Sequence, residues 1–214
     1  MVESLSFIHR FEPGTRPDGP PLLLLHGTGG DESDLLPLGK SISPGSPLLS
    51  PRGKVLEGGM PRFFRRLAEG VFDEDDLRRS ANDLAEFVEE ARKRYGIAAP
   101  IALGYSNGAN IAAALLLLRP HLLAGAMLLR AMVPLKEAPK AELAGKPILI
   151  LSGRFDPIIP SSNSSRLAAM LADDGARVQQ NTLPVGHGLT QADVDLARKW
   201  IHEQAAVLPT EARR

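Results

Sequence analysis

The feature of this sequence that most constrains its fold is the alternation of short apolar runs with longer amphipathic segments. PLLLLHG at 21–27 and KPILILSG at 146–153 show no apolar–polar alternation and end at glycine. Strands of that composition are buried on both faces of a parallel sheet. The pattern predicts an α/β fold in which a mostly parallel central sheet of about seven strands is flanked by helices. The expected strands lie near 4–11, 21–26, 46–50, 100–105, 124–130, 147–152 and 177–183.

The clearest predicted helix lies within 72–96. Its apolar residues recur every three or four positions, acids occupy the first turn, bases occupy the last, and Gly96 follows. Further helices are expected at about 107–118, 162–173 and 191–207. The least regular stretch, 50–72, is long for a connection inside a compact domain, so it is either an active-site loop or a disordered excursion.

Composition and charge narrow the class of protein. The chain has 214 residues, 43% of them hydrophobic, which suffices for one domain spanning 1–214. Lys and Arg total 25, as do Asp and Glu, and the longest charged cluster, DEDDLRR at 73–79, mixes both signs, so no nucleic-acid partner is expected. The longest apolar run, IAAALLLL, is far shorter than the roughly 18 residues of a membrane span, and the N-terminus lacks a signal-peptide pattern. We therefore expect a cytoplasmic protein without stable membrane insertion, and whether it forms a homodimer stays open.

Several kinds of site are excluded by what the sequence lacks. It contains no cysteine, which rules out a disulfide framework, a thiolate zinc site and a cysteine nucleophile. It also has no HExxH, GxxxxGK[ST] or helix-opening GxGxxG motif. We expect neither a metal nor a cofactor.

A candidate nucleophile lies in GYSNGAN at 104–110, between an expected strand and an expected helix. A turn tight enough to project a serine hydroxyl above the sheet strains the backbone at Ser106. Flanking Gly104 and Gly108 let the neighbouring backbone approach without a Cβ clash. The pattern GxSxG is a modest signal alone, but between a strand and a helix it indicates a catalytic serine.

A serine nucleophile requires a base and a group that orients the base. Of the five histidines, only His187 lies in a glycine-flanked loop directly after an expected strand. Asp156 follows the apolar run 147–152, at the strand end where ligands bind in open α/β sheets. The predicted triad is therefore Ser106, His187 and Asp156. The remaining acids near helix ends, Asp173, Asp174, Asp193 and Asp195, are explained by capping or solvation.

These residues resemble the α/β-hydrolase superfamily, and within it the phospholipase/carboxylesterase family of small serine esterases. The matching pieces are LLLHGTGGDESDLLPL, SPRG, GYSNGAN, LSGRFDPIIP and VGHGLT, and together with MPRFFRR they look closest to a bacterial esterase subgroup. The resemblance implies an oxyanion hole formed by the backbone N–H groups of Thr28 and Asn107. It assigns no role to the Asn107 side chain, and it implies that His26 shapes the loop through hydrogen bonds.

The resemblance also bears on the substrate. Larger members of the superfamily insert a helical cap after the strand that follows the serine helix, but only 131–146 is available here, so no cap domain is expected. Short loops should wall the site. The candidate substrate-binding residues are Leu35, Met60, Phe63, Phe64, Met132, Val133 and Leu189.

The sequence therefore predicts a serine carboxylesterase that hydrolyses short- to medium-chain or aryl carboxylic esters through an acyl-enzyme intermediate, with a small-molecule ester as its partner. Two alternatives remain open. One is an acyl-thioesterase or lysophospholipase, and the other is a hydrolase-fold protein that binds a ligand without turning it over. A dienelactone hydrolase would share the fold but would use a cysteine, which this chain does not have.

Overall fold

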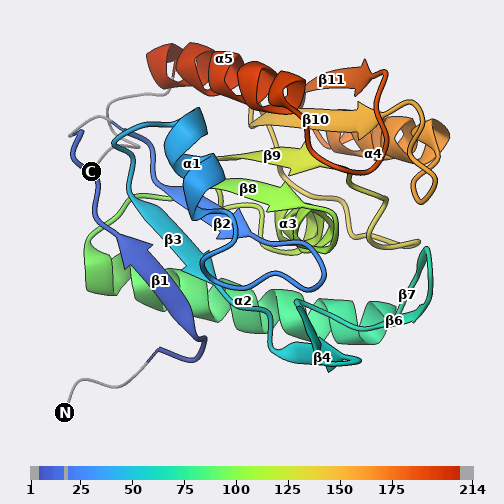
Figure 1. Cartoon of the computed structure of the whole chain (residues 1–214), viewed down its shortest axis with the longest axis horizontal. Helices are drawn as coiled ribbons and strands as arrows, with labels where there is room; N and C mark the ends of the chain where they lie inside the picture. Colours follow the sequence, from blue (N-terminus) through green and yellow to red (C-terminus); the bar gives the residue numbers. More distant parts are fainter. Residues whose placement is uncertain (1–4, 17–18, 208–214) are drawn as a thin grey trace.

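The computed structural model describes residues 5–16 and 19–207, and a seven-stranded sheet forms its centre (Figure 1). Only the first strand is antiparallel to its neighbour, and every other adjacent pair is parallel, which confirms the predicted mostly parallel sheet. In spatial order the strands are β1 (His9–Glu12), β3 (Leu48–Pro51), β2 (Leu22–Leu25), β8 (Ile101–Tyr105), β9 (Gly125–Leu129), β10 (Pro147–Gly153) and β11 (Arg177–Leu183).

Helices cover both faces of this sheet (Figure 1). One face carries α1 (Leu36–Ile42) and α5 (Gln191–Val207), and the other carries α2 (Glu74–Tyr95), α3 (Asn107–Leu118) and α4 (Ser161–Asp173). Strand β2 shows why its run is apolar throughout. Leu23 and Leu25 belong to the core beneath α2 and α3, whereas Leu22 and Leu24 belong to the core beneath α1 and α5.

Outside the segment 50–72, the expected helices and strands lie close to the observed ones, with two differences. The first strand begins at His9, later than the expected 4–11, and residue 4 lies outside the described residues. Helix α1 was not expected, because its seven residues are too few to show a helical period and Pro37 interrupts the apolar pattern. Proline is tolerated there because it stands in the first turn, where its missing N–H would have no partner.

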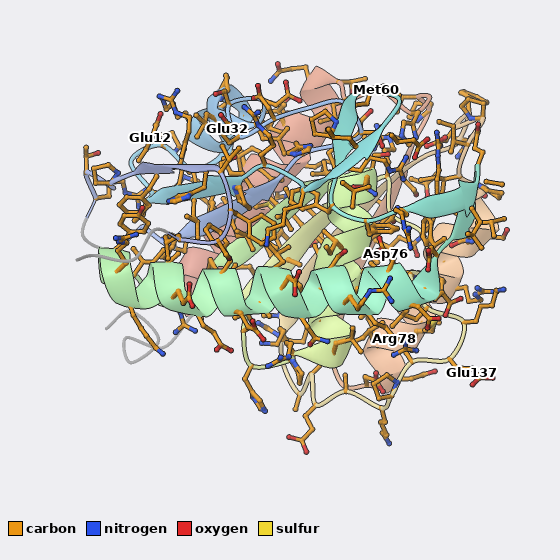
Figure 2. All side chains as sticks on the ribbon, turned by 90° about the horizontal axis from the view of Figure 1, so that it is seen from below. Glu12, Glu32, Met60, Asp76, Arg78 and Glu137 are labelled. Carbon is orange, nitrogen blue, oxygen red and sulfur yellow. The ribbon has the colours of Figure 1, made fainter. Side chains whose placement is uncertain are left out.

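The segment 50–72 is ordered into two small hairpins. The first pairs β4 (Val55–Glu57) with β5 (Met60–Arg62), and the second pairs β6 (Arg66–Ala68) with β7 (Val71–Phe72). Gly58 and Gly59 form the first turn with φ of 57° and 83°, the positive values that a two-residue hairpin turn requires. The Gly-Gly pair was the sequence signal for this hairpin. In Figure 2, Met60 on the first hairpin and Glu137 lie on opposite sides of α2.

The loop at 131–146, which joins β9 to β10, contains no helix or strand, as the expected lack of a cap domain predicts.

Helix α2 has the N-terminal and C-terminal capping residues that its sequence indicates. The Asp73 side chain accepts a hydrogen bond from the Asp76 N–H at the start, and Gly96 is left-handed at the end. Within the described part of the chain, no helix combines the length and apolar character needed to cross a membrane.

Candidate active site

Ser106 lies in the turn between β8 and α3, with φ 52° and ψ −114°. A serine adopts this backbone only under strain, and such strain is typical of a nucleophile elbow. The flanking glycines are required by close packing. A Cβ on Gly104 would lie 2.6 Å from the carbonyl oxygen of Gly108, and a Cβ on Gly108 would collide with the Leu25 carbonyl. The turn therefore stays tight because β2, β8 and α3 pack backbone against backbone.

The three predicted triad residues come together from the ends of three strands, β8, β10 and β11. His187 Nε2 lies 2.9 Å from Ser106 Oγ, and His187 Nδ1 lies 2.8 Å from Asp156 Oδ2. The second carboxylate oxygen of Asp156 accepts hydrogen bonds from the backbone N–H groups of Ile158 and Ile159. The Asp156 side chain is 1% exposed and that of His187 is 19% exposed. The acid is thus fixed and shielded, whereas the base remains open to a substrate.

Among the residues that the structure describes, no acceptor competes for the two amides assigned to an oxyanion hole. Asn107 is the first residue of α3, so no preceding helical carbonyl accepts its N–H. The Thr28 N–H donates no hydrogen bond within 5–16 and 19–207. Both amides are therefore available to a substrate oxygen.

His26 joins the loop that carries Thr28 to the segment after β3. The Gly53 N–H donates to His26 Nε2 at 3.0 Å, and His26 Nδ1 donates to the Gly27 carbonyl at 2.7 Å. Because Nε2 accepts a hydrogen bond, the proton of the neutral ring resides on Nδ1. Burial lowers the pKa of His26, since desolvation disfavours the charged imidazolium. His26 is thus a neutral structural residue, as its expected role in shaping the loop requires.

Two further contacts bring the sequence motifs HGTGGDE, PRG and MPR together. The Arg52 guanidinium binds the Glu32 carboxylate with two hydrogen bonds, and the Gly29 N–H donates to the Pro61 carbonyl at 3.0 Å. Gly53 must be glycine because a Cβ would collide with the Arg62 backbone. The first hairpin is therefore fastened directly to the candidate oxyanion loop.

Some of the predicted wall residues lie beside these loops. Met60 is 45% exposed, and its Sδ is within van der Waals distance of a Cβ placed on Gly29. Phe63 is buried with its ring 4.7 Å from that of His26. Met132, which keeps a small exposed surface, reaches towards Gly70 at the tip of the second hairpin. The 50–72 segment therefore contacts the candidate oxyanion loop through Met60 and Phe63, and it contacts the loop after β9 through Met132.

The remaining wall candidates divide into two groups. Val133 is nearly buried, and Leu189, beside the base, is partly buried. Phe64 and Leu35 lie in the core of the structure, and a role for either in substrate binding stays a prediction. Phe64 is fully buried with its ring edge-on to Phe72, and Leu35 packs in the core beneath α1 and α5. Both side chains pack in the core, and a sequence pattern does not distinguish a core residue from a residue that lines a pocket.

Sequence reasoning missed the residues that support the triad loops. Arg130 and Asp193 form a buried ion pair with oxygen–nitrogen distances of 2.8 and 3.0 Å. Tyr105 donates from its hydroxyl to the His187 carbonyl at 3.2 Å. Burial raises the pKa of Tyr105, which keeps the hydroxyl protonated as a donor at neutral pH. The available signal was the charged Arg130 directly after the apolar run GAMLL.

The strand order, the strained serine turn after β8 and the histidine loop after β11 define an α/β-hydrolase fold. The phospholipase/carboxylesterase family matches residues 9–204, and the chain belongs to this family. It is 46% identical over 197 residues to a Bacillus subtilis (strain 168) protein named "Putative hydrolase MhqD", and the match covers 91% of this chain and 98% of that protein.

Solved carboxylesterases share the whole architecture. The Bacillus cereus carboxylesterase is 46% identical with a TM-score of 0.90, covering 94% of this chain and 95% of that one. The Mesorhizobium loti carboxylesterase is 33% identical with a TM-score of 0.88, covering 94% and 97%. The protein is therefore a hydrolase of the carboxylesterase type.

Proposed function

We propose that this protein is a serine carboxylesterase that hydrolyses short- to medium-chain or aryl carboxylic esters through an acyl-enzyme intermediate. The observation that carries the proposal is the hydrogen-bonded series Ser106–His187–Asp156, with distances of 2.9 and 2.8 Å. The arrangement supplies a nucleophile, a base within reach of its proton, and a buried carboxylate that orients the base.

Acylation follows from this geometry. Ser106 Oγ attacks the ester carbonyl carbon while His187 Nε2 accepts the hydroxyl proton. The carbonyl oxygen becomes an oxyanion, which the N–H groups of Thr28 and Asn107 stabilise. The C–O bond to the alcohol then breaks, and the His187 imidazolium gives its proton to the leaving oxygen. Asp156 stays ionised and stabilises the imidazolium.

Deacylation repeats these steps with water. His187 Nε2 takes a proton from the water molecule whose oxygen attacks the acyl carbon. A second oxyanion forms between the same two amides. The bond to Ser106 Oγ then breaks, His187 returns the proton to this oxygen, and a carboxylic acid leaves. The net reaction consumes one water and needs no cofactor.

The loops that surround the triad support a small acyl or aryl group. No cap element follows β9 within 131–146, so we expect Met60, which lies against Gly29, and Met132, which lies against Gly70, to contribute apolar walls. Contact with an apolar wall stabilises the bound acyl or aryl group only for those atoms that the wall removes from water.

The test combines turnover with covalent labelling. The purified protein should release nitrophenol from nitrophenyl butyrate, and a fluorophosphonate should abolish this activity by adding one phosphonyl group to Ser106, identified by peptide mass spectrometry. The variant Ser106→Ala should neither turn over nor label. Binding of the ester without turnover or labelling would instead favour the non-catalytic alternative, and labelling at another serine would refute the assigned nucleophile.

A further inference from the structure

The loop that carries His187 is held through its backbone carbonyls. The Phe155 N–H donates to the Val185 carbonyl at 3.0 Å, and the Tyr105 hydroxyl donates to the carbonyl of His187 itself at 3.2 Å. Phe155 precedes the triad acid in the chain, and Tyr105 precedes the nucleophile. The base loop is therefore fastened to both of the segments that its imidazole must reach.

Arg130 holds the carbonyls on either side of His187. Its Nε donates to Gly186 O at 3.1 Å, and its Nη2 donates to Gly188 O at 3.0 Å. Arg130 directly follows β9, the strand between those that end at the nucleophile and at the acid. One rigid guanidinium thus spans the residue before the base and the residue after it.

The guanidinium has no spare hydrogen-bonding capacity. Nη1 donates to Leu151 O at 3.2 Å and to Asp193 Oδ1 at 2.8 Å, and the second proton of Nη2 goes to Asp193 Oδ2 at 3.0 Å. With the two loop carbonyls, all five N–H donors of the side chain are used. The Arg130 side chain is 0% exposed, so displacement of the loop would leave buried donors without partners.

Asp193 fixes the other side of this arrangement. It is 1% exposed and accepts from the Thr190 N–H and hydroxyl at the start of α5, in addition to Arg130. The pair therefore links the first turn of α5, the end of β9 and the base loop. Arg130 also has φ 57°, a backbone value that non-glycine residues adopt only when the surroundings enforce it.

We propose that Arg130, oriented by Asp193, is a positioning residue that holds the His187 imidazole in register with Ser106 and Asp156. The inference deepens the proposed esterase function and rests on it. Arg130 contacts neither substrate nor reacting atoms, so its effect should fall on kcat rather than on KM. If the ion pair served stability alone, its disruption would lower the melting temperature but would leave kcat of the folded enzyme unchanged.

The first variant is Arg130→Lys, which keeps the charge but loses the planar, five-donor geometry. We expect kcat to fall about 10- to 100-fold with KM changed less than about threefold, because small displacements of a catalytic group have effects of this size. The proton NMR signal of the His187 Nδ1–H in its bond to Asp156 should broaden or disappear. Arg198→Lys is the matched control, since Arg198 also binds a backbone carbonyl, that of Ser41, at a different site.

A double variant separates positioning from stability. Arg130→Met alone leaves Asp193 buried and uncompensated, and it could fail to fold. Arg130→Met combined with Asp193→Asn removes both charges and keeps an acceptor for Thr190. We expect its melting temperature to exceed that of Arg130→Met, while kcat stays at least about tenfold below wild type. Ile201→Ala, in the core beneath α5, is a destabilised control that should keep its kcat.

Two results would overturn the inference. One is kcat within about threefold of wild type in the folded Arg130→Lys protein or double variant. The other is an unchanged Nδ1–H signal in both. A failure of the esterase proposal would be distinguishable, because wild type would then show neither ester turnover nor fluorophosphonate labelling, whereas the NMR signal would still report whether Arg130 orders His187.

Discussion

The side-chain oxygen of Asn107 accepts a hydrogen bond from the backbone N–H of Phe63 at 2.8 Å. Three positions further along α3, Asn110 accepts in the same way from the N–H of Met132, also at 2.8 Å. Through its side-chain amides, the helix that begins at the nucleophile thus holds two segments, the one that contains Phe63 and the one that contains Met132. Asn107 therefore has a side-chain contact beyond the backbone N–H proposed for the oxyanion hole.

Asn107→Ala should therefore lower both the stability and the activity of the protein, which a residue that contributed only its backbone N–H would not do. It leaves the buried Phe63 N–H without an acceptor, which costs about 1–3 kcal/mol of unfolding free energy. The freed 62–64 segment should also lower kcat/KM. Urea unfolding and ester kinetics measure the two effects, and Asn82→Ala is a matched control because Asn82 accepts from the part-buried Arg119 side chain and not from a buried backbone N–H. Equal stability of the two variants would contradict the prediction.

The strained backbone at Ser106 predicts different stabilities for two inactive variants. Alanine retains the Cβ that makes φ 52° unfavourable, whereas glycine tolerates this conformation. We expect Ser106→Gly to be more stable than Ser106→Ala by about 1–3 kcal/mol, reduced by the greater freedom of glycine in the unfolded chain. Chemical denaturation of both proteins measures the difference. A less stable glycine variant would show that the turn is not under strain.

The contact between Asp156 and His187 predicts how turnover responds to the acid and to pH. Asp156→Asn should lower kcat by about 10³- to 10⁴-fold, since the amide no longer enforces the tautomer that presents Nε2 as the base. In wild type, kcat/KM should fall about tenfold per pH unit on the acid side, where protonated imidazole cannot accept the Ser106 proton. A flat profile between about pH 5 and 9 would argue against His187 as the base.

His26 predicts a loss of stability on the acid side. Its pKa in the folded protein is lowered by burial from the ordinary value of 6.5, so the unfolded chain binds the proton first as the pH falls. Its contribution to stability is therefore complete above that value and is lost as the pH decreases towards the folded-state pKa. His26→Gln should be less stable at pH 7.5 but should lose less free energy of unfolding between pH 7.5 and 5. Parallel losses in the two proteins would contradict this role.

The uncapped site predicts the acyl preference. We expect kcat/KM to peak at acyl chains of about two to eight carbons, because further methylenes contribute about 0.8 kcal/mol each only while they remain out of water. Nitrophenyl esters from acetyl to palmitoyl, with matched thioesters, provide the measurement. A maximum at about sixteen carbons, or a thioester preference above about a hundredfold, would favour the thioesterase or lysophospholipase alternative. It would also require the 50–72 hairpins to open an extended groove.

Local sequence patterns were sufficient for the sheet and for the three triad candidates. The run LLLL in PLLLLHG is apolar throughout because β2 is buried on both faces of the sheet. Its composition alone therefore predicts a central strand. The elbow around Ser106 is recognisable for the same reason, since its strain and close packing demand glycines within two residues of the serine. Asp156 and His187 follow strands whose ends meet at one edge of the sheet.

Tertiary structure alone decided which side chains support those residues. Arg130 meets Asp193 across 63 positions of sequence, and Asn107 meets Phe63 across 44. No local pattern encodes such pairs, because they depend on which strand ends the sheet order brings together and on which buried donors then lack an acceptor. The same reason explains why the burial of Phe64 could not be predicted, since an apolar side chain suits a pocket wall and the core equally well. The candidate catalytic residues can thus be predicted from single motifs. The residues that hold them in place are decided by packing between segments far apart in the chain.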